Sequence, residues 1–113
     1  MAKIIKIPSV YVLDTKVVGV SKDNSDGTSR QLIILREVLE DDVLNLELEP
    51  DNAYDPNAVK VMSKFGHQIG YLGRDVAERV KMAMQNDVSV KVVASWVSGE
   101  KYKGVGLRIE LVN

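Results

Sequence analysis

Residues 44–61 read LNLELEPDNAYDPNAVKV, and this stretch decides the fold. At its start leucines alternate with polar residues, which is typical of a half-buried β-strand and predicts one over residues 43–49. Residues 50–56 are rich in Pro, Asp and Asn, which favour a turn. A second strand is predicted over residues 58–63, so the stretch indicates two neighbouring strands joined by a polar loop.

Further strands are predicted on both sides of this pair. They are expected at residues 15–20, with 10–13 as an extension or a separate edge piece, and at residues 67–72, 88–96 and 105–111. A turn at Ser98-Gly99-Glu100 joins the last two strands into a long hairpin. Trp96 falls in register with the apolar face of its strand, so we expect it in the core.

Two helices interrupt the strands. Thr28 and Gln31 have the spacing of a capping box and predict the start of the first helix. Its core face is expected to consist of apolar residues at helical spacing, namely Leu32, Leu35, Val38 and Leu39. Asp75 and Glu78 form a second cap signature, and Asn86 is the expected stop of that helix. Short antiparallel strands with two helices predict a mainly β, α+β fold, built as a small, partly closed antiparallel β-barrel.

The composition limits the function classes that fit this chain. Its 113 residues suit one domain, and the net charge of −1 lacks the basic excess of a protein that coats nucleic acid. There is no Cys, and His67 is the sole His, so we expect no disulfide, metal site or cofactor. No apolar run is long enough for a membrane span, and we expect a soluble, cytoplasmic protein.

No pattern in the sequence predicts an enzyme. A P-loop is absent, and His67 is a lone histidine with no second histidine to form a catalytic constellation, so we expect a strand-edge residue there and no catalytic site. The acidic residues Glu37, Glu40, Asp41 and Asp42 are interpreted as a solvated helix end.

Three segments together resemble the HIRAN family. They are VVGV at residues 17–20, LELEPDNAYDPNAVKV at residues 46–61 and GHQIGYL at residues 66–72. The resemblance implies an OB-like β-barrel, with residues 15–113 as the HIRAN domain and residues 1–14 as an N-terminal extension or edge strand. It also implies nucleic-acid binding, because a DNA-binding member of the family captures the 3′ end of single-stranded DNA.

The resemblance also implies a set of DNA-binding residues. By position in the motifs, Tyr54 would stack near the terminal base, Asp55 would accept a hydrogen bond from the 3′-hydroxyl, and Arg74 would face a phosphate. Asn52 and Tyr71 complete the groove, and weaker candidates are Lys22, Lys60 and Tyr102.

The same residue types also have a purely structural interpretation. Asn and Asp side chains often bond the backbone amides of their own turn, so Asn52 and Asp55 can be turn formers. The chain also departs from its DNA-binding relative, since residues 21–23 are Ser-Lys-Asp where the relative has Arg-Tyr-Tyr. Tyr102 is the available substitute for a late Phe of that relative.

Two functions remain in view. The first is a nucleic-acid-binding module that recognises single-stranded DNA 3′ ends in DNA repair or processing. The alternative is a protein-interaction or oligomerisation module, in which an unpaired segment at residues 4–13 adds a strand to a second copy, a helicase or a nuclease. A nucleotide hydrolase is disfavoured because the sequence lacks a P-loop.

Overall fold

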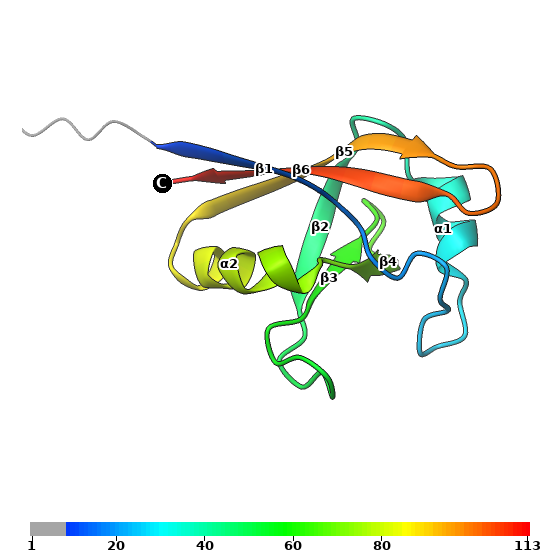
Figure 1. Ribbon diagram of the computed structural model, residues 1–113, viewed down its shortest axis with the longest axis horizontal. Helices are drawn as coiled ribbons and strands as arrows, with labels where there is room; N and C mark the ends of the chain where they lie inside the picture. The colour runs from blue at the N-terminus through cyan, green and yellow to red at the C-terminus, as the bar shows by residue number, and fades with distance from the viewer. Residues whose placement is uncertain (1–8) are drawn as a thin grey trace, which may run out of the picture.

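The structure is a computed structural model, and it describes residues 9–113. Its elements in chain order are β1 (Val10–Lys16), α1 (Arg30–Glu37), β2 (Val43–Leu48), β3 (Val59–Met62), β4 (Gln68–Tyr71), α2 (Arg74–Gln85), β5 (Ser89–Ser98) and β6 (Gly104–Val112). Figure 1 shows the six strands and two helices. The prediction of a mainly β fold with two helices is therefore confirmed.

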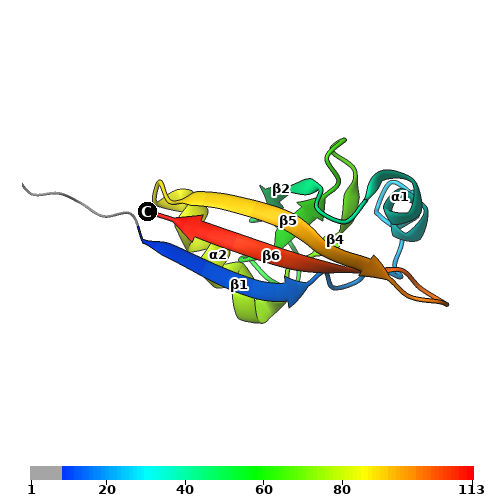
Figure 2. The ribbon, with the colours of Figure 1, turned by 90° about the horizontal axis from the view of Figure 1, so that it is seen from above.

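The strands form one curled antiparallel sheet in the order β1-β6-β5-β2-β3-β4. The long strands β1, β6 and β5 lie side by side as one layer, and α2 lies beneath them (Figure 2). The two ends of the sheet meet at Val18, whose amide and carbonyl both bond Tyr71 of β4, at 2.9 and 3.0 Å. This bridge makes the predicted partly closed barrel.

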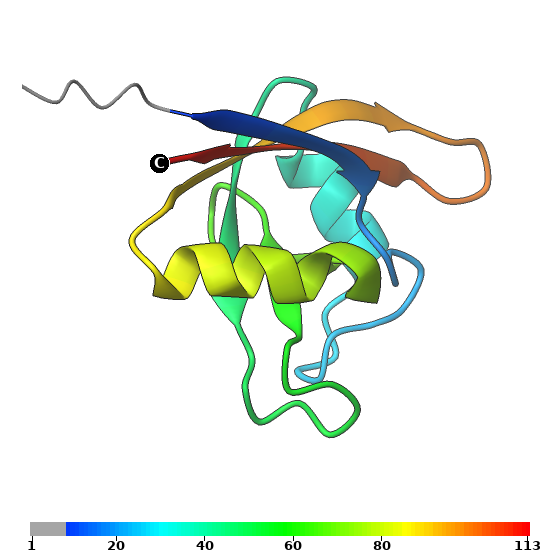
Figure 3. The same cartoon turned by 60° about the vertical axis from the view of Figure 1, so that its left-hand side comes forward.

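The core fills the space between the two halves of the sheet. The α2 helix runs along the open side of this space (Figure 3) and buries four residues there: Val76, Ala77, Val80 and Ala83. The inward face of β6 supplies Leu107 and Ile109, which are fully buried. Both sets follow the predicted periodicities, 3.6 residues for the helix and 2 for the strand.

Gly70 allows the barrel to close. A Cβ atom at this position would lie 2.4 Å from the carbonyl oxygen of Val18 and 2.5 Å from Cγ1 of Val17. Only glycine permits so close an approach of two backbones. The glycine of the Ile-Gly-Tyr motif in β4 is therefore required because the Val17–Val18 segment crosses directly over it.

The first strand differs from its prediction. It spans Val10–Lys16, so the predicted extension at residues 10–13 is confirmed, whereas residues 17–20 are not part of the strand. Residues 10–13 pair with β6, so they are not the unpaired segment predicted for strand addition. After Lys16 the chain turns inward, burying Val17, and Gly19 takes a positive φ of 75°. The rest of the predicted unpaired segment, apart from Ser9, lies outside the described residues. None of the helices within residues 9–113 is long and apolar enough to cross a membrane.

The caps of both helices also differ from prediction. Ser29 caps α1, since its hydroxyl accepts from the amide of Leu32. Gln31 instead holds the β5–β6 hairpin, accepting from the Lys103 amide at 2.7 Å and donating to its carbonyl at 2.9 Å. Gly73 occupies the cap position of α2, with Asp75 in the first turn and no side-chain cap bond.

The predicted core face of α1 is wrong for three of its four residues. Ile34 and Val38 are buried, whereas the three leucines are exposed: Leu32, Leu35 and Leu39. The two consecutive isoleucines, which the predicted core face did not include, pack toward the core: Ile34 is buried and Ile33 half-buried. An apolar run without clean periodicity does not reveal which face of a helix packs inward.

Trp96 is likewise outside the core, and 41% of its surface is exposed. The pairing of β5 with β6 shifts between Ala94 and Trp96, which marks a bulge. One extra residue moves every later side chain to the opposite face of the sheet. Trp96 therefore lies on the outer face, although sequence alternation placed it inside.

Candidate nucleic-acid interface

Six of the eight predicted site residues line one hollow of about 290 Å³, which we call the Tyr54 hollow. Its complete lining is Val18, Lys22, Asn52, Tyr54, Asp55, Ala58, Tyr71, Leu72 and Arg74. The hollow lies where the β2–β3 loop, the end of β4 and the start of α2 meet the chain that crosses from β1. Sequence-distant residues therefore share one open surface.

Asn52 shapes the β2–β3 loop from within. Its Oδ1 accepts from the amides of Tyr54 and Asp55, at 2.9 and 3.0 Å. Asp55 Oδ1 in turn accepts from the amide of Asn57 at 2.9 Å. The predicted bonds from Asn52 and Asp55 to backbone amides are therefore formed, and they fix the conformation of the loop.

The loop leaves two groups open to a ligand. Tyr54 is 86% exposed, so its ring projects from the protein. The second carboxylate oxygen of Asp55, Oδ2, has no hydrogen-bond partner within residues 9–113. An exposed ring and a free carboxylate oxygen thus belong to two consecutive residues that both line the Tyr54 hollow.

Glu49 does not line the hollow, but it bonds Asn52 and Tyr71, two lining residues that we call the floor, and sequence reasoning missed it. Its Oε1 accepts from Asn52 Nδ2 at 2.6 Å and from the Tyr71 hydroxyl at 2.8 Å, and its Oε2 lies 3.0 Å from Lys60 Nζ. Burial works to raise the pKa of Glu49, but the hydrogen bonds from Asn52, Lys60 and Tyr71 outweigh it and hold the pKa below its usual value. The sequence feature that could have indicated Glu49 is its place at the end of a predicted strand, diagonal to Lys60 of the next strand.

A buried cation lies behind Tyr71. Arg30 is 6% exposed, and its guanidinium carbon is 5.4 Å from the centroid of the Tyr71 ring. It also donates to Asn24 Oδ1 at 2.7 Å and to the Gly19 carbonyl at 2.8 Å. Because these contacts bury it, Arg30 fixes the ring and the Gly19 turn and is not open to a ligand.

The exposed charges of the Tyr54 hollow come from Lys22 and Arg74. Arg74 is the first residue of α2, and its NH2 group is 3.4 Å from the Tyr54 carbonyl, a long contact that holds it only loosely. Lys22 also lines the hollow, from the turn that its amide closes onto Gly19. The hollow therefore offers two exposed cations together with the ring of Tyr54 and the carboxylate of Asp55.

Two predicted residues lie outside this hollow. Lys60 is paired with Glu49, so it supports the floor from β3 and does not line the opening. Hydrogen bonding to Glu49 raises the pKa of Lys60. Tyr102 lies in the turn between β5 and β6, with Lys101 Nζ 5.7 Å from its ring, and the structure does not bring it to the site.

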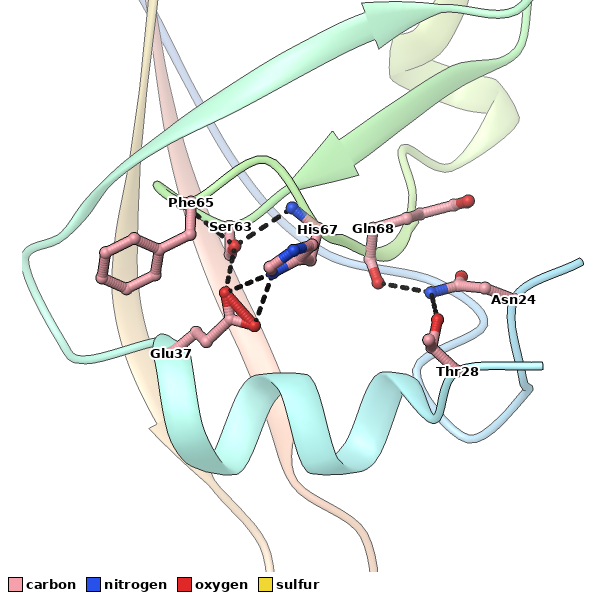
Figure 4. A network of polar contacts seen from close by, with 7 residues as sticks. All are labelled: Asn24, Thr28, Glu37, Ser63, Phe65, His67 and Gln68. Carbon is pink, nitrogen blue, oxygen red and sulfur yellow. Dashed lines mark hydrogen bonds and ion pairs between the residues drawn. The ribbon is translucent and has the colours of Figure 1, made fainter. Parts of the chain in front are cut away.

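A second hollow, of about 360 Å³, lies beside His67. Figure 4 shows His67 Nδ1 facing the carboxylate of Glu37, at 2.7 and 2.8 Å, while Ser63 donates to the same group. Glu37 is therefore bound to its neighbours and is not the freely solvated residue that the acidic run predicted. Within residues 9–113 no three His, Asp or Glu side chains gather as metal ligands.

The fold is a curled antiparallel half-barrel that carries a polar hollow at one loop, the architecture of a small OB-like binding domain. The chain belongs to the HIRAN domain family, whose model matches residues 10–111. The chain is 38% identical over 48 residues to the helicase-like transcription factor (HLTF) of Mus musculus. That match covers 42% of this chain but only 5% of the length of the mouse protein.

Solved structures agree with this assignment. The crystal structure of the HIRAN domain of human HLTF is similar with a TM-score of 0.73 and 21% identity, covering 94% of this chain and 79% of that one. The NMR structure of the HLTF HIRAN domain in its DNA-bound conformation has a TM-score of 0.63 and 22% identity, with the same coverage of both chains. At this level of identity the likeness shows the shared fold.

Proposed function

We propose that this HIRAN domain binds single-stranded DNA and holds its 3′ end in the Tyr54 hollow. The observation that carries the proposal is that the ring of Tyr54, the carboxylate of Asp55 and the guanidinium of Arg74 line one open hollow. The DNA-bound conformation recorded for the HLTF domain, a member of the same family with the same fold, supports DNA as the ligand.

The chemistry of the hollow suits a strand end. A base can stack on the exposed Tyr54 ring, which is worth about 1–3 kcal/mol per base. Asp55 Oδ2 can accept a hydrogen bond from a free 3′-hydroxyl, whereas a phosphate at the same place would face a like charge. The carboxylate thus selects a terminus, and the ring holds the last nucleotide beside it.

The charges of the hollow set how much DNA the domain contacts. Lys22 and Arg74 can neutralise about two phosphates, and the net charge of −1 supplies no long-range attraction. For single strands the logarithm of affinity falls by roughly 0.7 per neutralised phosphate for each logarithm of salt. We therefore expect a shallow salt dependence and a module that recognises ends in DNA repair or processing, with no catalytic step of its own.

The test is a fluorescence anisotropy titration with a 5′-labelled oligothymidylate that ends in a 3′-hydroxyl or a 3′-phosphate. We expect the hydroxyl form to bind at least tenfold more tightly. Asp55→Asn should reduce the difference in affinity between the two oligonucleotides, because the amide carries no charge to repel the phosphate. The matched control is Asp51→Asn, a change in the same loop outside the hollow's lining. Equal binding of both oligonucleotides by the native protein would contradict 3′-end recognition.

A second candidate, a protein-interaction module, has one observation in its favour. β1 is the edge strand of the sheet, and Val10, Tyr11 and Val12 expose apolar surface along it. Exposed apolar edge strands readily add a strand from another chain. The simplest partner is a second copy of this chain, and the alternative partner is a segment of a helicase or a nuclease.

Light scattering coupled to size exclusion tests this candidate. Native protein should show a concentration-dependent mass above 12.5 kDa, and Val12→Lys should return it to the monomer because a charge at an edge blocks pairing. If the native protein is monomeric at all concentrations, the hypothesis of self-association through β1 is wrong.

A further inference from the structure

Trp96 lies on the outer face of the sheet on a floor made of glycine. A Cβ atom at Gly106 would lie 2.0 Å from Nε1 of the indole, and one at Gly104 would lie 3.2 Å from Cζ3. The indole therefore extends along β6 over both glycines, in the space that two side chains would otherwise fill. With 41% of the residue exposed, the ring has its inner side on the sheet and its outer side open to solvent.

A cation stands in the same row of the sheet. Gly106 of β6 is in register with Trp96 of β5 on one side and with Lys16 of β1 on the other. Since the residue between them has no side chain, nothing separates Lys16 from the indole along this row. Lys16 is exposed and has no carboxylate within ion-pair distance among the described residues.

Two hollows border this pair of residues. One, of about 370 Å³, is lined by Trp96, Lys16 and residues 17–21, and the other, of about 460 Å³, lies on the Asp14 and Ser95 side. The first shares Val18 with the Tyr54 hollow, so the segment from Val18 to Lys22 is the ridge between the two. The ridge ends in Lys22, which faces the Tyr54 hollow.

We propose that Trp96 is a second base-stacking subsite for single-stranded DNA, reached by nucleotides that leave the Tyr54 hollow across the Val18–Lys22 ridge. This proposal rests on the proposed function, since the strand end fixes which nucleotides reach the ridge. Lys16 and Lys22 supply the positive charge for the phosphates of that path. A ring on a glycine floor is held rigidly, so stacking on it costs little side-chain entropy.

The subsite has a stated chemistry. Stacking uses the π-face that every base has, so Trp96 reads no sequence. Its effect is to add affinity for strands that are long enough to cross the ridge. A dinucleotide held at the Tyr54 hollow should not benefit, whereas an octanucleotide should.

Trp96 is the sole tryptophan of the chain, so its fluorescence reports this one site. With excitation that is selective for tryptophan, oligothymidylate of eight nucleotides should quench the native protein, and the dinucleotide should leave the emission nearly unchanged. Anisotropy of the labelled octanucleotide gives the affinity in parallel. Quenching by the octanucleotide confirms direct contact, a result that a merely structural role for Trp96 would not produce.

A substitution adds the energetic test. Trp96→Leu keeps apolar cover over the glycines but removes the flat ring, and we expect about tenfold weaker binding of the octanucleotide, which corresponds to about 1.4 kcal/mol. Binding of the dinucleotide should not change. The matched control is Phe65→Leu, which removes an exposed ring that lines neither the Tyr54 hollow nor the hollow beside Trp96 and should leave both affinities intact. Circular dichroism verifies that each variant folds.

The outcomes separate the two proposals. Octanucleotide binding that depends on a free 3′-hydroxyl but neither quenches Trp96 nor weakens in Trp96→Leu overturns the subsite and leaves end recognition standing. Quenching that is indifferent to the 3′ group supports the subsite and contradicts end recognition. If no oligonucleotide binds, both proposals are wrong.

Discussion

The Tyr71 hydroxyl donates to Oε1 of Glu49 across 2.8 Å, and this bond joins β4 to the residue that follows β2. The strand between them, β3, is joined to the same carboxylate through Lys60, whose Nζ binds Oε2 of Glu49. One carboxylate therefore fastens three strands at the floor of the Tyr54 hollow. Neutral, singly bonded side chains could not replace it without leaving a donor unpaired.

Glu49→Gln should therefore weaken both the fold and the site. The amide keeps the shape but loses the charge that Lys60 and Tyr71 share, and charge-assisted hydrogen bonds are worth about 1.5–3 kcal/mol. We expect about 1–2 kcal/mol lower free energy of unfolding in urea and several-fold weaker DNA binding. The matched control is Glu47→Gln, an exposed acid of the same strand, which should change stability by less than about 0.5 kcal/mol. Equal effects of the two changes would contradict the role given to Glu49.

The same carboxylate predicts a pH dependence. The hydrogen bonds to Glu49 hold its folded-state pKa below the ordinary value of 4.5. A lowered folded-state pKa contributes stability that is fully present above pH 4.5 and is lost as the pH falls through the folded-state value. Urea unfolding between pH 3 and pH 7, roughly the window in which carboxylates titrate, should show this loss below 4.5, and the slope there should be shallower in Glu49→Gln.

Gly70→Ala should be among the most destabilising single changes in the chain. The added methyl group would lie 2.4 Å from the Val18 carbonyl oxygen, and both are held in the barrel closure. We expect a loss of about 3 kcal/mol or more, measured by thermal denaturation. Gly27→Ala is the control, because a Cβ there meets nothing within 4 Å and the change costs only backbone strain at a φ of 86°. Similar losses for both would refute the account of the crossing.

Arg74→Ala and Lys22→Ala should each lower DNA affinity and flatten its salt dependence. Each change removes one cation of the Tyr54 hollow, so the slope of log affinity against log salt should fall by roughly 0.7. Anisotropy titrations at several salt concentrations measure this. Lys91→Ala, an exposed lysine of β5 away from both hollows, should leave the slope unchanged. An unaltered slope in both hollow variants would place the phosphates elsewhere.

Sequence patterns predicted strands β2 to β6 and the α2 helix because regular alternation and helical spacing fix which face is buried. The same reasoning failed where an irregularity breaks the period. The bulge before Trp96 moved that residue to the outer face, and the Ile33-Ile34 pair concealed the inward face of α1. A periodic pattern assumes that no extra residue is inserted, so a bulge can be recognised only once the pairing register of the strands is known.

Sequence reasoning indicated the candidate residues of the Tyr54 hollow, with Tyr71 and Arg74 coming through the family resemblance, but it missed residues that act only through contacts with distant segments. Asn52, Tyr54 and Asp55 share one turn, so local chemistry and the family resemblance both indicate them. Glu49 and Arg30 act through partners in other elements, at Tyr71 and at the Gly19 turn. Their role depends on the barrel closure, which no local pattern encodes.

The backbone that closes the barrel at Val18 continues directly from the free edge at β1. Val17 alone thus separates the end of β1, an edge strand of the sheet, from Val18, which lines the Tyr54 hollow. If a chain docks on β1 and DNA binds in the Tyr54 hollow, as proposed above, a shift of β1 on docking would move Val18 and so change the hollow. Thermodynamic reciprocity then requires that DNA and the docked chain alter each other's affinity by one common factor.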